Sequence, residues 1–375
     1  MVRSPHMLAS KSPFWLGNRP ALDGLRGISI LFVLIHHIGL FVKLPFRLLP
    51  GGFLGVDLFF VISGFLITSL LFEEHLKIGR IELKQFYMRR GLRLAPALIT
   101  VVLFTCVLAL LVGADAIGMT NLRLVSTILY FANWVRAFEG TGEPWLLGAC
   151  WSLSIEEQFY LIWPAVLILL LRLKPRTVIA IVFSGIAASC VWRFVLHGLG
   201  LAPMRLYHGS DTRADSILIG CLLSLMLHWE YVPRWITRHL NTLSRVAGVM
   251  LVLLAAFVGW KDEFLYLGGF TVIEILASVI LLHALFAPPR ILSNSFLLWI
   301  GKRSYGLYLW HWPIFVLAAT LPKPYGLIVG VAGTFIIAAL SFRFIETPFL
   351  NLKRRYSPQA HSRLSRLSRE TEAVA

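Results

Sequence analysis

The sequence predicts an all-α protein that crosses a membrane about ten times, with both termini in the cytoplasm. Of the 375 residues, 57% are hydrophobic and only 14% are charged, whereas soluble domains are about 45–50% apolar and about 25% charged. The mean hydropathy is +0.75, and apolar runs of the length that spans a bilayer, about 20 residues, recur along the chain. These observations exclude an ordinary soluble enzyme, a coiled coil and a disordered chain.

The predicted spans follow one another with short connections. In chain order they are 27–42, 53–72, 95–112, 151–171, 177–197, 213–230, 245–260, 266–286, 296–319 and 324–346. They divide the chain into a cytoplasmic N-terminal segment (1–26), a transmembrane domain (27–346) and a basic cytoplasmic tail (347–375) that we expect to be disordered. The stretch 122–135 is apolar but short, so we expect an interfacial or re-entrant helix there.

The distribution of basic residues supports ten spans. The 35 Lys+Arg against 19 Asp+Glu leave a net charge of +16. The segments expected in the cytoplasm contain 24 Lys and Arg and the opposite segments contain 7, as the positive-inside rule predicts. Counting 122–135 as a span would invert the topology downstream and remove this bias. We therefore attribute the excess charge to membrane topology, and we expect no nucleic-acid partner.

Charged residues inside apolar segments are candidate functional residues, because a charge at bilayer depth costs about 2.5–3.5 kcal/mol on insertion scales. His37 follows Arg26 by eleven residues, which is about 16 Å along a helix, so His37 is expected near the middle of the membrane. There it could act as a general base, bind a metal or be a satisfied interior residue. Asp57 enters the second span near Gly52 and Gly55, either as a partner of a histidine or arginine or as a structural acceptor.

Two clusters precede later spans. Arg89, Arg90 and Arg93 lie before the third span, and the last two share a helix face. Guanidinium groups at this spacing suit phosphate oxygens, although the same residues could anchor the chain among lipid headgroups. Ser152 and Glu156 are four residues apart at the start of the fourth span, so they also share a face and are expected to line a cavity.

The remaining polar clusters suggest structural or supporting roles. Arg213 lies between Asp211 and Asp215 at the entrance to the sixth span and could pair with either, so we favour an ion-paired structural role for it. Tyr305, Tyr308 and His311 follow one another at intervals of three residues, so their side chains lie along one face of a helix. The sequence contains no HExxH, HxH or Cys/His spacing for a metal. We expect no metal, and we interpret the four dispersed cysteines as small buried hydrophobes.

Together these segments resemble the acyltransferase-3 family of integral-membrane O-acyltransferases. The matching segments are RPALDGLRGISILFVLIHH, GFLGVDLFFVISGFLIT, FYMRRGLRLAP, WSLSIEEQFYLIWP, DTRADSILIGCLL, SYGLYLWHWPIF and FIETPFL, which extend from residue 19 to residue 350. The first contains a spacing similar to the family's arginine-x10-histidine motif. The third resembles its RxxR motif and the fourth its SxxxE motif.

The resemblance implies an enzyme of the bacterial inner membrane that moves an acyl group, by default acetyl, from cytoplasmic acyl-CoA to a hydroxyl of a cell-surface or lipid-linked glycan. Many family members carry an SGNH-type hydrolase domain after the last span. We expect this chain to lack it, so that the membrane domain alone or a separate partner completes transfer. The main alternative is a transporter or flippase that uses the buried charges as a proton relay; another is a scaffold whose polar residues are only structural.

The resemblance and the chemistry of acyl transfer together assign expected roles. The catalytic candidates are His37, Glu156 and Asp57; the residues expected to bind the donor phosphates are Arg90, Arg93 and Arg89; the supporting residues are Arg26, Ser152, Tyr305, Tyr308 and His311. His37 is either the base that takes the acceptor proton or the nucleophile that receives the acyl group. The sequence does not specify this choice, the acceptor, the acyl group or the oligomeric state.

Overall fold

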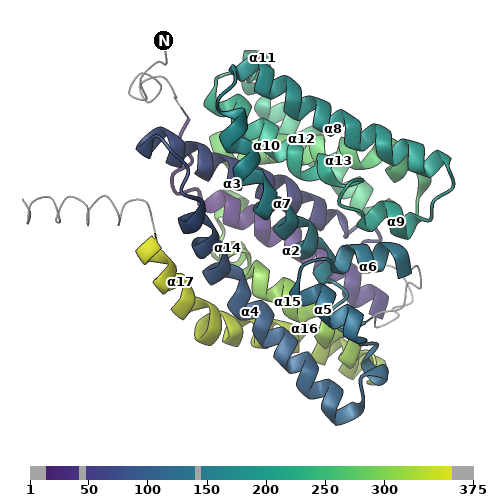
Figure 1. Cartoon of the computed structure of the whole chain (residues 1–375). Helices are drawn as coiled ribbons and strands as arrows, with labels where there is room; N and C mark the ends of the chain where they lie inside the picture. Colours follow the sequence, from purple (N-terminus) through teal and green to yellow (C-terminus); the bar gives the residue numbers. More distant parts are fainter. Residues whose placement is uncertain (1–13, 42–47, 140–144, 357–375) are drawn as a thin grey trace, which may run out of the picture.

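The computed structural model describes residues 14–41, 48–139 and 145–356, and within these ranges it contains helices and no β-strand. The helices form one bundle in which α8, α12 and α13 lie on one side and α4, α15, α16 and α17 on the other (Figure 1). The all-α fold class is therefore confirmed. Residues 357–375, most of the expected tail, lie outside the described ranges, whereas 347–353 form helix α17.

The longer helices are arranged in the order of the predicted spans. They are α2 (Pro20–Phe41), α3 (Leu54–Ile78), α4 (Leu83–Val112), α7 (Cys150–Leu170), α8 (Pro175–Gly198), α10 (Ala214–His228), α12 (Leu240–Phe257), α13 (Phe270–Phe286), α14 (Ser295–Lys302), α15 (Ser304–Ala318), α16 (Lys323–Ser341) and α17 (Thr347–Lys353). A single π-helical turn, η2 (Leu265–Gly269), precedes α13, and another, η4 (Phe342–Glu346), joins α16 to α17.

Eight helical units in the described part of the chain are long and apolar enough to cross a bilayer, which identifies an integral membrane protein. They include eight of the ten predicted spans. The sixth, expected at 213–230, is the 15-residue α10, and the ninth, expected at 296–319, is divided into α14 and α15 at Arg303. A 15-residue helix is about 22 Å long, short of the ~30 Å hydrocarbon core. α10 tolerates this length because it packs between α3 and α8 inside the bundle.

Helices α2 and α4 begin well before their predicted spans, by seven and twelve residues. α2 begins at Pro20, so Arg26 lies within the same continuous helix as His37. α4 begins at Leu83, so its arginines lie within the helix and not before it. The stretch 122–135 corresponds to two short helices, α5 (Asn121–Ile128) and α6 (Ala132–Glu139), separated by Tyr130 at φ 55°. Neither is long enough to span, as expected.

Helix α3 is the centre of the bundle, and glycines bring its neighbours close. In its most apolar stretch 78% of the residues are buried, against 28% for α4, α8 and α12, whose outer faces are left for lipid. A Cβ on Gly55 would collide with the Ser29 carbonyl of α2, and one on Gly64 would collide with the Ile217 carbonyl of α10. These two glycines therefore allow α2 and α10 to approach α3 closely.

Candidate active site

The first of two adjoining cavities is lined by arginines, and we call it the arginine cavity. It has a volume of about 110 Å³. The polar residues that line it are Arg26, Arg90, Arg93, Ser63, Ser152, Glu156, Ser304, Tyr160, Tyr305 and Tyr308. They come from α2, α3, α4, α7 and α15, so the tertiary fold brings together five of the matching segments, which are far apart in sequence.

Three guanidinium groups face one carboxylate in the arginine cavity. Glu156 accepts a hydrogen bond of 2.7 Å from the Ser63 hydroxyl, and the Arg90 guanidinium lies 3.7 Å from the centre of the Tyr160 ring. Tyr305 closes another side and donates to the Leu94 carbonyl at 2.9 Å. The excess of buried positive charge makes this cavity suited to an anion with several charged oxygens, such as a polyphosphate.

Arg89 does not line the arginine cavity. Its guanidinium donates to Glu74 Oε2 at 2.6 Å and to the Tyr356 carbonyl at 3.0 Å. These contacts tie α4 to α3 and to the segment after α17. The three adjacent arginines of the sequence therefore separate, with Arg90 and Arg93 in the cavity and Arg89 in a structural ion pair.

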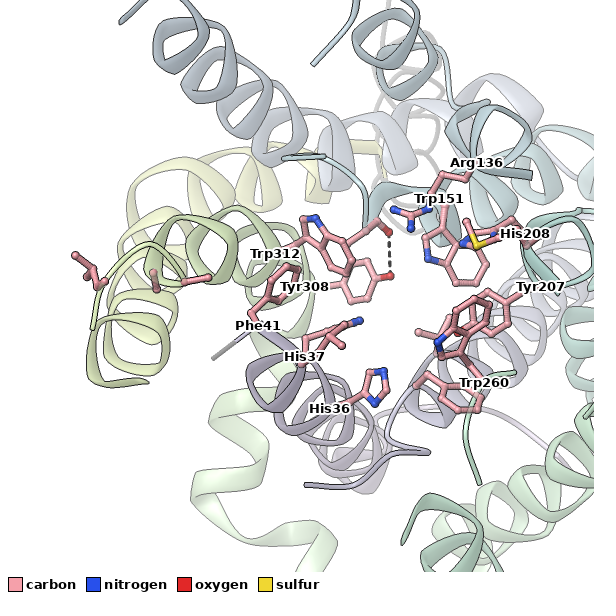
Figure 2. A pocket seen from close by; sticks show the side chains of 18 of the residues that line it. His36, His37, Phe41, Arg136, Trp151, Tyr207, His208, Trp260, Tyr308 and Trp312 are labelled. Atoms are coloured by element: carbon pink, nitrogen blue, oxygen red, sulfur yellow. Dashed lines mark hydrogen bonds between the residues drawn. The ribbon is translucent and has the colours of Figure 1, made fainter. Parts of the chain in front are cut away.

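The second cavity, with a volume of about 590 Å³, is lined by histidines and aromatic rings, and we call it the histidine cavity. Figure 2 shows His36 and His37 on one wall, and Arg136, Trp151, Tyr207, His208 and Trp260 on the wall opposite. His37 lies near the far end of α2 from Arg26. The two motif residues of this helix therefore line different cavities.

A chain of hydrogen bonds determines which nitrogen of His37 is free to react. His311 Nδ1 lies 2.6 Å from the Tyr308 carbonyl, which can only accept, so Nδ1 carries a proton. In a neutral ring His311 Nε2 is then an acceptor, and it lies 3.1 Å from His37 Nδ1. His37 Nδ1 must therefore donate, which leaves the lone pair on His37 Nε2.

Tyr308 lies between the two cavities and lines both. Its hydroxyl donates to the Ala149 carbonyl at 3.0 Å, the bond drawn as a dashed line in Figure 2. Because its only hydroxyl proton is used there, Ser152 is the donor in the 2.6 Å contact between the two hydroxyls. A tyrosine held by two hydrogen bonds thus separates the arginine cavity from the histidine cavity.

Asp57 lies outside both cavities, in a buried ion pair with Arg213 of the segment before α10. Arg193 of α8 binds Asp215 through two hydrogen bonds of 2.9 and 2.8 Å, and Arg205 binds Asp211. Arg213 is thus ion-paired as expected, but its partner is Asp57 of α3 and not either of its neighbouring aspartates. Pairing of Asp57 with an arginine of another span is confirmed.

Sequence reasoning missed Arg136 and His208, which line the histidine cavity from α6 and from α9 (Pro203–His208). Both helices lie in connections between spans, where hydropathy gives no signal. Arg136 donates to the Gly148 carbonyl at 3.1 Å, its Nε is buried without a hydrogen-bond partner, and among described residues no carboxylate lies within 4.0 Å of it. Burial lowers the pKa of Arg136 to about 10, so it is a cation at neutral pH.

The comparisons agree with these motifs. The sequence model of a family described as the acyltransferase domain matches residues 19–345. The peptidoglycan O-acetyltransferase OatA of Listeria monocytogenes is 39% identical over 352 residues, 88% of this chain and 55% of that protein. A putative O-acetyltransferase of Staphylococcus aureus is 36% identical over 91% of this chain and 60% of its own length.

A putative peptidoglycan O-acetyltransferase of Bacillus subtilis is 36% identical over 88% of this chain and 54% of its own length. The chain thus spans little more than half the length of the curated relatives it matches. No solved structure matches the chain.

Proposed function

The chain belongs to this acyltransferase family, and from that premise we propose that it is a membrane O-acyltransferase of the bacterial inner membrane. It moves an acyl group, by default acetyl, from cytoplasmic acyl-CoA to a hydroxyl of a cell-surface or lipid-linked glycan. Peptidoglycan is the first acceptor to test, because two of the relatives are named for it. The observation that carries this proposal is the pair of adjoining cavities, one cationic and one with a reactive histidine.

The arginine cavity supports donor binding. Arg26, Arg90 and Arg93 would hold the phosphates of CoA, with the cavity opening toward the cytoplasm. The pantetheine arm would then pass Tyr308 into the histidine cavity, a path comparable to the ~16 Å along α2 between Arg26 and His37. Glu156 lies among the arginines and away from His37, so we assign it to positioning the arginines and not to orienting the imidazole.

The histidine cavity supports the chemistry. In the overall reaction the thioester C–S bond breaks, an ester C–O bond forms, and the acceptor proton leaves its oxygen. His37 Nε2 would supply the lone pair, either as the base for the acceptor hydroxyl or as the nucleophile toward the thioester. Arg136 would stabilise the negative charge that develops on the carbonyl oxygen, where a half-buried cation with no carboxylate partner among the described residues is effective.

The test compares surface glycans from cells that lack the protein, contain it, or contain its His37→Gln variant. Mass spectrometry should detect acetyl esters only with the parent protein, while the variant reaches the membrane in equal amount. Esters at the parent level in the variant would contradict the assignment of His37. A glycan that crosses the membrane with unchanged mass, and no ester in any fraction, would instead favour the transporter or flippase.

A further inference from the structure

The wall of the histidine cavity that faces His37 is built from segments that the donor does not need. It consists of Arg136, Trp151, Tyr207, His208 and Trp260 (Figure 2). Four of these residues come from α6, α9 and the connection before η2, the fifth is Trp151 of α7, and none of the five lines the arginine cavity. The wall therefore adjoins the site of acyl transfer from the side opposite the donor.

His208 presents a lone pair on this wall. Its Nδ1 lies 2.9 Å from the Met204 carbonyl, so Nδ1 carries the ring proton and Nε2 is the acceptor. Burial, and then the nearby charge of Arg136, hold the pKa of His208 well below its usual range. The ring is therefore neutral at physiological pH and able to accept a proton.

Hydrogen bonds hold this wall in place. Asn133 of α6 donates to the His208 carbonyl at 3.1 Å and to the Ser210 hydroxyl at 2.9 Å. Ser210 donates to Gln158 of α7, and Gln158 donates to the carbonyl of Tyr130, a non-glycine residue with positive φ. The network thus fixes α6, α7 and the end of α9 relative to one another and holds His208 in place on the wall.

The aromatic lining indicates the class of ligand. The rings of Trp151 and Tyr207 pack against His208 at centroid distances of 4.7 and 5.0 Å, and Trp260 lies beside Tyr207. The electron-rich faces of aromatic rings attract the weakly positive C–H groups of a sugar. A cavity of 590 Å³ lies within the ~300–1,000 Å³ usual for ligand sites.

We propose that this wall is the acceptor site for a sugar hydroxyl and that His208 Nε2 takes the hydroxyl proton. The inference rests on the proposed function and assigns the two histidines separate tasks. With a base already on the acceptor side, His37 is the nucleophile that receives the acyl group. The reaction then proceeds in two half-reactions within one cavity.

In the first half-reaction His37 Nε2 attacks the thioester carbonyl, the C–S bond breaks and CoA leaves as the thiolate, which takes a proton from water. The proton on His37 Nδ1 passes to His311 Nε2, so that the acyl-imidazole is neutral. In the second, the acceptor oxygen bonds to the acyl carbon and its proton moves to His208. The C–N bond then breaks, His311 returns its proton to His37, and His208 loses its proton to water.

Arg136 couples the two steps. Its positive charge disfavours a second cation on His208 while the site is at rest. When negative charge develops on the carbonyl oxygen, that charge offsets the field of Arg136, so His208 becomes a stronger base as the proton is transferred. The charge of Arg136 thus opposes early protonation of His208 without preventing catalysis.

The experiment uses the full chain in lipid nanodiscs, with acetyl-CoA as donor and the disaccharide of N-acetylglucosamine and N-acetylmuramic acid as acceptor probe. One assay measures exchange of isotope between labelled CoA and acetyl-CoA without acceptor, which requires only the first half-reaction. The other measures ester formation on the disaccharide. The matched control is His239→Gln, because His239 contacts the Trp235 carbonyl at 2.9 Å as His208 contacts Met204, but on the exposed surface.

We expect His208→Gln to keep the exchange rate within about twofold of the parent while ester formation falls about 100-fold or more. Added imidazole should restore ester formation in His208→Ala, which a merely structural role would not allow. Equal losses of exchange and transfer in His208→Gln, or full transfer, would overturn the inference. If the parent protein forms esters but shows no isotope exchange, the inference is overturned and the proposed function stands. If the parent shows neither exchange nor ester formation, the inference and the proposed function are both overturned.

Discussion

At the scale of single residues, His311 shows how a side chain that lines neither cavity can determine which nitrogen of its neighbour reacts. Its Nδ1 is committed to the Tyr308 carbonyl and its Nε2 accepts from His37. Without His311, the His37 ring would lose its fixed tautomer and orientation, and the reactive lone pair would no longer be held on Nε2. Loss of the correct tautomer in a comparable catalytic pair costs orders of magnitude in rate.

We therefore predict that His311→Ala lowers kcat about 100-fold or more and leaves the KM for acetyl-CoA unchanged, because the arginine cavity is untouched. Steady-state kinetics on purified protein separate the two constants. His283→Gln is the control, since His283 binds Asn241 on a partly exposed surface away from both cavities. A parent-like kcat in His311→Ala would remove His311 from the mechanism.

Three arginines of α4 provide a second prediction at this scale. Arg90→Ala and Arg93→Ala should each raise the KM for acetyl-CoA about 10- to 100-fold, because a charge-assisted hydrogen bond contributes about 1.5–3 kcal/mol. Arg89→Ala should leave this KM unchanged but lower the thermal stability, since Arg89 pairs with the buried Glu74. Kinetics and thermal unfolding in detergent check both results. Equal KM values in all three variants would exclude donor binding by Arg90 and Arg93 and leave them only the role of an anchor among lipid headgroups.

At the scale of helices, packing depends on small residues at defined contacts. A Cβ on Gly64 of α3 would overlap the Ile217 carbonyl, and one on Gly220 of α10 would overlap the Val61 carbonyl. The two helices can therefore approach closely only with glycine at both positions. The same contact places the buried pair of Asp57 and Arg213 behind the cavity walls, so close packing and polar pairing support each other.

We predict that Gly64→Ala lowers the free energy of unfolding by about 1–3 kcal/mol, the usual cost of overpacking. Gly91→Ala on α4 is the matched control, because no atom lies within 4 Å of its added methyl and alanine favours a helix by about 0.5–1 kcal/mol. Thermal unfolding of both variants in one detergent gives the comparison. A Gly64→Ala variant as stable as Gly91→Ala would show that α3 and α10 can move apart without cost.

At the scale of the whole molecule, the proposed donor path requires the arginine cavity to face the cytoplasm. That orientation still rests on the distribution of basic residues, 24 against 7, and on 122–135 not spanning. Lys84 and Lys174 lie in segments expected inside, and Lys261 lies in a segment expected outside. Lys174 and Lys261 are exposed and follow 122–135 in the chain. Their side of the membrane therefore depends on whether 122–135 spans.

In a background without the four cysteines, we predict that Lys261→Cys reacts with a membrane-impermeant maleimide on intact cells, whereas Lys174→Cys and Lys84→Cys react only after lysis. If 122–135 spans the membrane, Lys174→Cys reacts on intact cells and Lys261→Cys reacts only after lysis, while Lys84→Cys stays protected. Labelling followed by gel shift measures each case. An exchange of the Lys174→Cys and Lys261→Cys results would contradict the ten-span topology, whereas reaction of Lys84→Cys on intact cells would place the arginine cavity on the wrong face for a cytoplasmic donor.

The sequence alone determined the fold class, the family resemblance and most of the motif residues that line the arginine cavity. These follow from local properties: hydropathy reports burial in lipid, and a spacing of three, four or eleven residues on a helix determines which side chains share a face or a depth. The same reasoning expected no span at 122–135, where the structure has two helices of eight residues each. It counted ten uniform spans, because hydropathy does not distinguish a helix surrounded by lipid from one surrounded by protein, such as α10.

Only the tertiary structure decided which residues meet. It separated Arg89 from Arg90 and Arg93, paired Asp57 with Arg213, and placed Glu156 beside the arginines and away from His37. It also brought Arg136 and His208 from connecting helices to the cavity and set the tautomer of His37 through His311. Each of these contacts joins segments 15 to 274 residues apart, and no local period encodes such a distance, because it results from how whole helices pack.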